Sequence, residues 1–340
     1  MTAERHIRLP RRLSWAVAGG FAGYALARLT AADRLPLIGI PGATLLPFTP
    51  QAAAAAWACA LLLGDERTSA VTTAAAVGLT AALVPRAIAR SQPAASGPEL
   101  RVLTANLLAG RADISEVIEL VRSTNADVMF VQELTDHAAK DFSAAGLDQL
   151  LPYAITDLGT AEERGNGIYA RHPLDPWPEN MPTSSIQPVV TMKLGSTRVR
   201  LACVHLWAPK GPWSPWGVER WRADLEALSL LSVPADRAVL PRGDDPPAYT
   251  PLIAAGDFNS TVDHADFRRL LGKGFIDAAC QTGNGLTPTW GFIPGGRLAL
   301  VTIDHVLADA RCAVLGTSVH SLRGTDHRAV FARIRLPDLA

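Results

Sequence analysis

The first ninety residues of the chain contain three apolar runs, at positions 13–29, 44–63 and 70–88. Each run has 17 to 20 residues, near the lower limit for a helix that spans the hydrocarbon core of a bilayer. A secretory signal peptide also begins with basic residues and an apolar run, but it has one such run. The three runs therefore favour anchoring helices, and a buried soluble hairpin of Ala-rich helices is the alternative.

Basic residues near the ends of these runs predict the orientation. Four arginines precede the first run, which predicts a cytoplasmic N-terminus: Arg5, Arg8, Arg11 and Arg12. Three crossings then place everything after Arg90 outside the cytoplasm. If one run does not span, the remainder of the chain lies in the cytoplasm instead. We expect a multi-pass protein of the cell membrane whose C-terminal domain is extracytoplasmic.

A Pro/Ser/Gly-rich stretch at 91–98 separates this membrane segment (1–90) from a domain over 99–340. The pattern in that domain predicts more strands than helices, and several successive strands have no helix between them. Such strands must be antiparallel or cross between sheets. We predict an α/β domain of two packed mixed sheets with helices outside. The strands are expected near 101–106, 127–133, 167–171, 188–194, 198–206, 251–255, 302–308, 312–319 and 328–335, and the helices near 114–121, 217–231 and 263–271.

Acid, amide and imidazole side chains follow the ends of these apolar strands. Strand ends on one rim of a sheet converge, and several carboxylates there repel one another unless a cation lies among them. Oxygen ligands favour Mg²⁺, with Mn²⁺ or Ca²⁺ as alternatives. Such an ion offsets the charge of a phosphate substrate. Taken singly, each residue is more often a cap, a turn former or a rim polar group. The set is Asn106, Glu133, His205, Asp257, Asn259, Asp304, Asp326 and His327.

These residues occur in motifs whose order resembles the endonuclease/exonuclease/phosphatase superfamily, which includes the DNase I-like nucleases. The resemblance covers roughly 99–337, and the combination of Gly256-Asp-Phe-Asn259 with Thr325-Asp-His327 is its most specific part. It implies a four-layer α/β sandwich with a single site at one rim. The other matching segments are Leu103-Thr-Ala-Asn106, Val131-Gln-Glu133, Gly165-Asn-Gly-Ile-Tyr-Ala-Arg171, Val204-His205 and Thr302-Ile-Asp304.

The resemblance also implies a role for each site residue. Glu133 resembles the principal metal ligand, and Asn106 and Asp326 resemble supporting ligands. His327 resembles the catalytic histidine, oriented by Asp304. His205 and Asn259 resemble donors to the scissile phosphate, and Asp257 resembles the residue that positions or deprotonates the attacking water. Whether Asp257 or His327 takes that proton is open. His305 alternates to the other face of its strand and is expected to be a packing residue.

The net charge and the cysteine content exclude few classes of function. The chain is neutral overall: residues 1–98 hold nine basic and four acidic side chains, and residues 99–340 hold the other 23 and 28. A strong nucleic-acid binder usually shows a basic excess, which is absent here. The four cysteines lack the CxxC spacing of a metal site, and a Cys280–Cys312 disulfide is one option for an extracytoplasmic domain.

Two substrates and one non-enzymatic function fit these features. A membrane-lipid phosphatase fits the tether, the slightly acidic domain and the tryptophans after His205, although these tryptophans could equally pack on the domain itself. The arrangement also resembles bacterial membrane phosphatases that act on polyprenyl pyrophosphate. A membrane-tethered nuclease would use the same catalytic set, with the aromatic and basic residues from Lys210 to Arg222 lining its groove. A binding module that has lost catalysis is the third alternative. The expected partners are the bilayer and a phosphorylated substrate, with no obligate protein partner.

Overall fold

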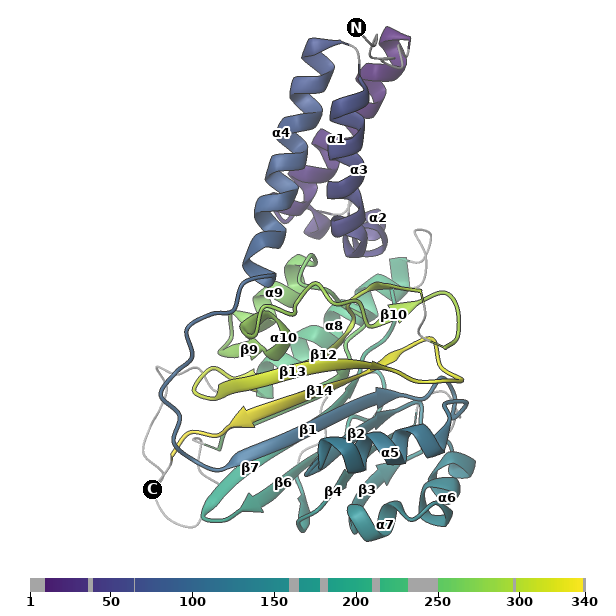
Figure 1. The fold of residues 1–340 in the computed structure, drawn as a ribbon, viewed down its shortest axis with the longest axis vertical. Helices are drawn as coiled ribbons and strands as arrows, with labels where there is room; N and C mark the ends of the chain where they lie inside the picture. Colours follow the sequence, from purple (N-terminus) through teal and green to yellow (C-terminus); the bar gives the residue numbers. More distant parts are fainter. Residues whose placement is uncertain are drawn as a thin grey trace, which may run out of the picture. The chain divides into compact units, whose positions relative to one another are not determined.

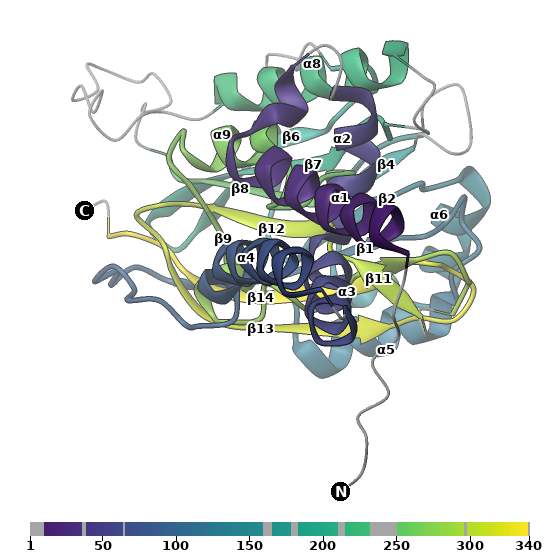
Figure 2. The same cartoon turned by 90° about the horizontal axis from the view of Figure 1, so that it is seen from above.

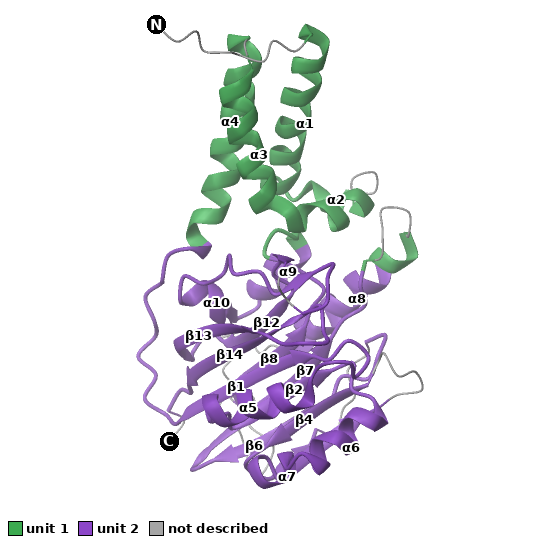
Figure 3. Cartoon of the chain, turned by 45° about the vertical axis from the view of Figure 1, so that its right-hand side comes forward, with its two compact units in different colours: residues 1–85, 209–218, 262–265 green, residues 86–208, 219–261, 266–340 purple. Residues whose placement is uncertain are grey.

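The computed structural model describes residues 10–35, 39–63, 65–158, 165–177, 183–209, 215–231, 250–295 and 298–338. The chain forms two compact units (Figure 3). Unit 1 comprises Met1–Pro85 together with Pro209–Val218 and Val262–Ala265, and unit 2 comprises the remaining residues. The predicted residues Lys210 and Trp213 lie outside the described part of the chain.

Unit 1 is helical, as the apolar runs predict. Its elements are α1 (Arg11–Leu29), η1 (Ala32–Arg34), α2 (Gly39–Leu45), η2 (Leu46–Phe48), α3 (Thr49–Leu62) and α4 (Glu66–Leu83), followed by η3 (Val84–Arg86). Two described stretches are long and apolar enough to cross a membrane, Gly39–Leu62 and Glu66–Arg86. The first predicted span is the helix α1, but it is not among these two. It carries Arg11, Arg12 and Arg28, and Arg28 is buried with its Nε 2.6 Å from Asp263 Oδ1.

Unit 2 is built on two six-stranded mixed sheets (Figures 1 and 2). The first has the order β13-β14-β1-β2-β4-β3 and the second the order β5-β6-β7-β8-β12-β9. The strands are β1 (Glu99–Asn106), β2 (Val128–Gln132), β3 (Tyr153–Asp157), β4 (Asn166–Ala170), β5 (Leu174–Pro176), β6 (Val189–Leu194), β7 (Thr197–His205), β8 (Leu252–Asp257), β9 (Phe275–Asp277), β12 (Asp304–Asp309), β13 (Ala313–Ser321) and β14 (Arg328–Arg335), with a separate hairpin of β10 (Trp290–Gly291) and β11 (Ala299–Val301).

Helices cover the outer faces of both sheets. Helices α5 (Ile114–Thr124), α6 (Asp136–Ala144) and α7 (Leu147–Leu150) pack on the first sheet, where Val117 and Phe142 join Leu103 and Met129 in one apolar cluster. On the second sheet, Trp221 of α8 (Pro215–Leu231) donates to Ser260, and α9 (Ala265–Leu271) packs there as well. The short α10 (Ala278–Gln281) follows β9. The predicted four-layer sandwich is therefore confirmed.

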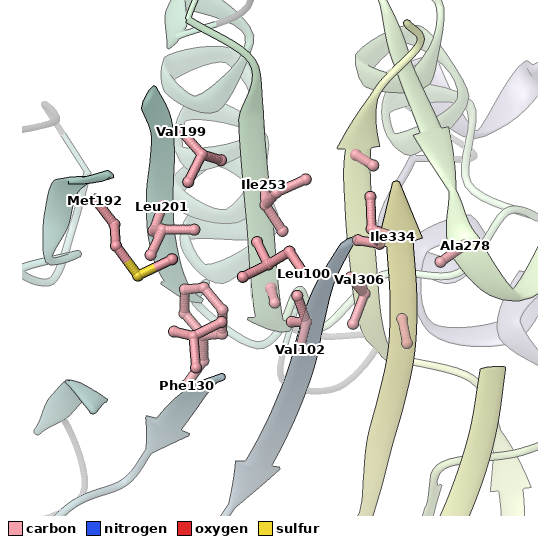
Figure 4. Packing of buried hydrophobic residues seen from close by; sticks show 14 of the residues in the cluster. Leu100, Val102, Phe130, Met192, Val199, Leu201, Ile253, Ala278, Val306 and Ile334 are labelled. Carbon is pink, nitrogen blue, oxygen red and sulfur yellow. The ribbon is translucent and has the colours of Figure 1, made fainter. Parts of the chain in front are cut away.

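The apolar core between the two sheets determines which side chains at the strand ends point into the interior. On β1, Leu100 and Val102 face the second sheet, where they meet side chains such as Leu201 and Ile253 (Figure 4). Because side chains alternate along a strand, Asn106 points to this same interior at the rim. The registers Asn106↔Gln132, His205↔Asp257 and Asp304↔Asp257 align the strand ends of each sheet. The hydrophobic pattern that buries the strands thus also turns their terminal polar residues inward.

The stretch predicted as a linker is held along unit 2. Ala89 bridges Thr282, and the Arg90 amide donates to the Gln281 carbonyl at 2.9 Å. The Gln92 side chain accepts from the Val314 amide, and Gly97 donates to the Leu336 carbonyl. The boundary between the two units accordingly lies between Pro85 and Arg86. The prolines of the segment 91–98 favour an extended backbone, which can form hydrogen bonds with a neighbouring backbone.

The cysteines are all free in the structure, so the Cys280–Cys312 disulfide considered from the sequence is not formed. Cys280, Cys312 and Cys203 are buried. Burial raises the pKa of the Cys203 thiol to about 12, which keeps it neutral and unreactive. These cysteines act as small apolar core residues.

Candidate active site

The predicted site residues meet at one rim of unit 2. Asn106, His205 and Asp257 end β1, β7 and β8, and Glu133 directly follows β2. Asp304 begins β12 and His327 immediately precedes β14, two strands that run antiparallel to their neighbours in the two sheets. The carboxyl ends of β1, β2, β7 and β8 therefore lie at the same edge as the amino ends of β12 and β14. Residues more than 200 positions apart in the sequence become neighbours there.

His327 and Asp304 form a buried pair. The His327 Nδ1 atom lies 3.1 and 3.0 Å from the two Asp304 carboxylate oxygens, and its Nε2 lies 3.7 Å from Asp257 Oδ2. Asp304 therefore accepts from Nδ1 and holds the ring with Nε2 toward the site. Two threonines hold the backbone around the pair: Thr289 Oγ1 accepts from the Asp304 amide, and Thr325 Oγ1 accepts from the His327 amide.

The electrostatics of this cluster favour a protonated histidine. Burial by itself would lower the pKa of His327, but the charge and hydrogen bond of Asp304 and the charge of Asp257 raise it to about 10. Burial raises the pKa of Asp257 to about 7, against the lowering effect of the His327 charge. These shifts favour a charged His327 ring beside the Asp304 and Asp257 carboxylates, with Nε2 3.7 Å from Asp257 Oδ2.

Glu133 is held in a left-handed turn directly after β2. Its φ is +55°, and its two carboxylate oxygens accept from Asn106 Nδ2 at 3.1 Å and from the Ala109 amide at 2.8 Å. Burial raises the pKa of Glu133 against the lowering effect of these hydrogen bonds. A cation beside this carboxylate would offset the cost of keeping it ionised in a half-closed site.

The donor set fits a hard divalent cation. The Asp326 Oδ1 atom is buried without a hydrogen-bond partner, while its Oδ2 accepts from the Trp290 indole at 3.0 Å. This Oδ1 lies 3.9 Å from His327 Nε2, and the Asp326 charge helps to raise the pKa of Glu133. A buried carboxylate oxygen without a hydrogen bond is a donor suited to a hard cation. Among the described residues, Asp257, Asp304 and His327 also lie close enough to share an ion. Both Asp304 oxygens already face His327, which leaves the Glu133–Asp326 side with the freer oxygen donors for an ion.

Three predicted residues have engagements that the sequence did not show. The Asn106 amide nitrogen faces Glu133 and Asp257, and its oxygen accepts from the Leu108 amide, so metal ligation through that oxygen requires the amide to turn. Asn259, at a left-handed φ of +46°, donates from Nδ2 to the Leu206 carbonyl. His205 Nε2 lies 3.8 Å from Glu133 and 3.9 Å from Asp257. All three lie at the site.

A polar layer beneath the site was not predicted. The Gln132 side chain accepts from Thr104 Oγ1 at 3.1 Å and donates to Cys203 Sγ at 3.3 Å, and so joins the two sheets. Its position on the inner face of an apolar strand, two residues after Phe130, was the available signal. Trp290 was also missed, because nothing in its sequence surroundings indicates that an indole will contact Asp326.

His305 belongs to the support of the site. It is fully buried, with Nδ1 2.6 Å from Asp277 Oδ2 and Nε2 2.9 Å from the Ser260 carbonyl. Both partners are acceptors, so both ring nitrogens carry protons and His305 is an imidazolium paired with the Asp277 carboxylate. It also packs on Phe258 and Phe267. The expectation of a packing residue agrees with this position, and the ring additionally fixes the turn after Asn259.

The tryptophans after His205 divide between core and surface. Trp221 is 1% exposed and donates to Ser260, so it is a core residue of unit 2. Trp207 lies under the Arg220 guanidinium at 4.5 Å. Trp216, in unit 1, is 59% exposed. Trp221 therefore packs on the domain itself and is not available to a membrane.

Comparison with known proteins places these motifs in a family pattern. The profile of the "Endonuclease/Exonuclease/phosphatase family" matches residues 103–327, from the middle of β1 to His327. No curated protein shows significant sequence similarity to the chain.

Solved structures of similar fold include an endonuclease/exonuclease/phosphatase from Beutenbergia cavernae DSM 12333, at 19% identity and a TM-score of 0.53, covering 71% of this chain and 73% of that one. A protein described as an endonuclease/exonuclease/phosphatase family member, from Bacteroides thetaiotaomicron, matches at 14% identity and a TM-score of 0.50, covering 72% and 100%. D. rerio TDP2 complexed with single strand DNA product matches at 15% identity and a TM-score of 0.50, covering 69% and 98%. At these identities the likeness concerns the fold.

Proposed function

Because the chain belongs to the endonuclease/exonuclease/phosphatase family, we propose that it is a Mg²⁺-dependent phosphoesterase that cleaves a phosphate ester or anhydride bond by attack of water. The observation that carries this proposal is the convergence of Glu133, Asp257, Asp326 and the Asp304–His327 pair on one rim, where Asp326 Oδ1 accepts no hydrogen bond and lies 3.9 Å from His327 Nε2. Mn²⁺ or Ca²⁺ would fit the same oxygen donors.

Each residue has a part in the proposed reaction. Glu133 and Asp326 would hold the ion, with Asn106 in support, and the bound ion would supply positive charge beside the phosphoryl oxygens. Asp257 would accept the proton of the attacking water, because His327, with Nε2 3.7 Å from Asp257 Oδ2, already carries a proton. His205, and Asn259 through its second N–H, donate to the phosphate. Asp304 keeps the His327 ring in place.

For the substrate we favour a lipid pyrophosphate, such as a polyprenyl pyrophosphate, in a membrane. Two helical stretches are apolar enough to anchor the chain, and residues 99–340 carry no basic excess. The arginines before α1 favour a cytoplasmic N-terminus, and an extracytoplasmic site then requires α1 to cross the membrane as a third span beside these two stretches. Protease added to intact cells should then cleave unit 2, and protection of unit 2 until the membrane is opened would contradict that orientation.

The alternative is a nuclease, supported by the fold shared with a structure that contains a single-strand DNA product. A third, non-catalytic function has less support, because every family position holds a residue able to act. Purified enzyme should be compared on polyprenyl pyrophosphate, plasmid DNA and sphingomyelin, with and without EDTA. Selective turnover of DNA would exclude the lipid substrate.

A Glu133→Ala variant tests catalysis itself. We expect the Mg²⁺-dependent turnover of a phosphodiester dye to fall at least about 100-fold, because the ion loses its main carboxylate. Glu116→Ala, which removes a side chain on α5, serves as the control and should retain activity. Equal rates for wild type and Glu133→Ala would contradict catalysis at this site, and no Mg²⁺-dependent turnover by wild type would favour the binding-module alternative.

A further inference from the structure

The β10–β11 hairpin exposes large apolar side chains at its tip. Phe292 is 66% exposed, and Ile293 and Leu298 are each 54% exposed. A single exposed apolar residue is ordinary, but three on one short hairpin form a patch of the kind that marks an interaction site. The sequence from Trp290 to Val301 contains one charged residue, Arg297, so the element is unsuited to a purely electrostatic partner.

This hairpin is attached to the segment that carries Asp326 and His327. The Gly291 amide donates to the Asp326 carbonyl at 3.2 Å, and the Gly295 amide donates to the Thr325 carbonyl at 2.6 Å. The Trp290 indole donates to Asp326 Oδ2, and its backbone bridges His327. The Phe292 ring stands edge-on against Trp290, with centroids 4.9 Å apart. Apolar surface therefore extends from beside His327 to the exposed tip.

A membrane is the occupant that the chain geometry favours. The candidate span Glu66–Arg86 ends at a residue of unit 2, because the Arg86 carbonyl accepts from the Gly285 amide at 3.0 Å. Seven residues separate Gly285 from Phe292, which can span at most about 25 Å. If Glu66–Arg86 crosses a bilayer, the helix leaves the bilayer near Arg86, which is bonded to Gly285. Phe292 then lies at most about 25 Å from Gly285. This holds for any arrangement of the two units.

We infer that the β10–β11 hairpin is a lipid-contacting element: Phe292, Ile293 and Leu298 enter the outer part of a bilayer and bring a phosphate-bearing lipid to the site beside Asp326 and His327. The inference rests on the proposed phosphoesterase function and assigns it a substrate class, lipids presented by a membrane. A nucleic-acid strand would instead need several basic side chains beside the stacking ring, and the hairpin sequence supplies one.

The test uses the full chain reconstituted in phosphatidylcholine vesicles. A Phe292→Ser/Ile293→Ser variant should hydrolyse vesicle-borne polyprenyl pyrophosphate at least tenfold more slowly than wild type. It should cleave a soluble phosphodiester dye at the wild-type rate, because no site residue has changed. Leu315→Ser, which removes a 40% exposed leucine on β13, is the matched control and should match wild type on both substrates.

The outcomes separate the two proposals. If wild type cleaves neither substrate with Mg²⁺, the phosphoesterase function fails. If wild type cleaves both and the double variant matches it on vesicles, only the lipid-contact inference is overturned. A variant that keeps lipid turnover but loses cleavage of single-stranded DNA also overturns it, in favour of a nucleic-acid surface.

A second measurement does not depend on turnover. The variant Ile293→Cys is made in a Cys59→Ala background and labelled with a polarity-sensitive fluorophore. The emission of the label should shift to the blue in phosphatidylcholine nanodiscs, compared with the same protein held in an amphipathic polymer without lipid or detergent. The same label at Leu315→Cys should not shift. Equal emission at both positions in nanodiscs would overturn the inference even if the double variant folds poorly.

Discussion

Asp304 and His327 show how one buried carboxylate can set the protonation of a neighbour. Both Asp304 oxygens face His327 Nδ1, and the resulting pKa of about 10 keeps the ring protonated despite its burial. In an Asp304→Asn variant the ring loses this charge partner and its fixed tautomer. We expect kcat to fall by about 100-fold or more, with a smaller change in KM.

Steady-state kinetics on a soluble phosphodiester would measure this effect. Asp309→Asn, at the opposite end of the same strand β12, is the control and should keep kcat within about twofold. A kcat equal to wild type in Asp304→Asn would show that the pair is structural only.

The Asp277–His305 pair predicts a pH-dependent stability. Burial acts against both charges, but mutual attraction and the hydrogen bond between them raise the pKa of His305 above 6.5 and lower the pKa of Asp277 below 3.8. The His305 contribution is present below pH 6.5 and is lost as pH rises through its raised pKa. The Asp277 contribution is present above pH 3.8 and is lost as pH falls through its lowered pKa.

The pair therefore stabilises the fold most between about pH 4 and pH 6.5. An Asp277→Asn variant should lose about 3 kcal/mol of the free energy of unfolding at pH 6. It should lose less at alkaline pH, because the wild type no longer has the contribution of protonated His305 there. Thermal unfolding of both proteins at pH 6 and pH 9 would measure the difference. An unchanged gap between them across this range would contradict the charged pair.

At the scale of elements, the ends of β7 and β8 approach too closely for any side chain at position 256. Gly256 has φ +148°, and a Cβ there would lie 1.8 Å from the Val204 carbonyl oxygen. Asp257 follows directly, so a shift of this backbone displaces a site residue. We expect Gly256→Ala to cost more than about 3 kcal/mol and to abolish activity.

Chemical denaturation would measure the loss in Gly256→Ala. The matched change is Gly316→Ala on β13, where no atom lies within 4 Å of the new Cβ. It should stay within about 0.5 kcal/mol of wild type. Similar stability of the two variants would mean that the backbone at Gly256 can relax, and the close approach would not explain the glycine.

At the scale of the whole molecule, the boundary between the units predicts where the chain can be cut. Residues 86–98 hydrogen-bond to α10, β13 and the C-terminal end of β14. A chain that begins at Arg86 keeps these contacts, whereas one that begins at Glu99 exposes the backbone groups they satisfy. We expect the shorter chain to unfold at a temperature several degrees lower.

Thermal unfolding of the two truncated chains, with turnover of a soluble phosphodiester, would check this prediction. Both chains retain every site residue, so activity at low temperature should be similar. Equal unfolding temperatures would show that residues 86–98 contribute nothing to unit 2, as expected of a loose linker.

The sequence by itself determined the longer strands, the helices α5, α8 and α9, the two mixed sheets and the eight polar residues at the rim, but not the helices α6, α7 and α10. These follow from periodicity and from motif order, which are local properties read along the chain. It missed the short strands β3, β5 and β9 to β11, because two to five residues carry too little periodic signal. It also separated 91–98 from the domain that this segment joins by backbone bonds.

Only the tertiary structure decided which side chains meet. The contact of Trp290 with Asp326, the bridging of the sheets by Gln132 and the pairing of His305 with Asp277 all join residues from different elements. Such contacts depend on how strands register and which face each side chain takes after packing. A linear pattern specifies the faces, but the partner across the interior is fixed only when the sheets close on one another.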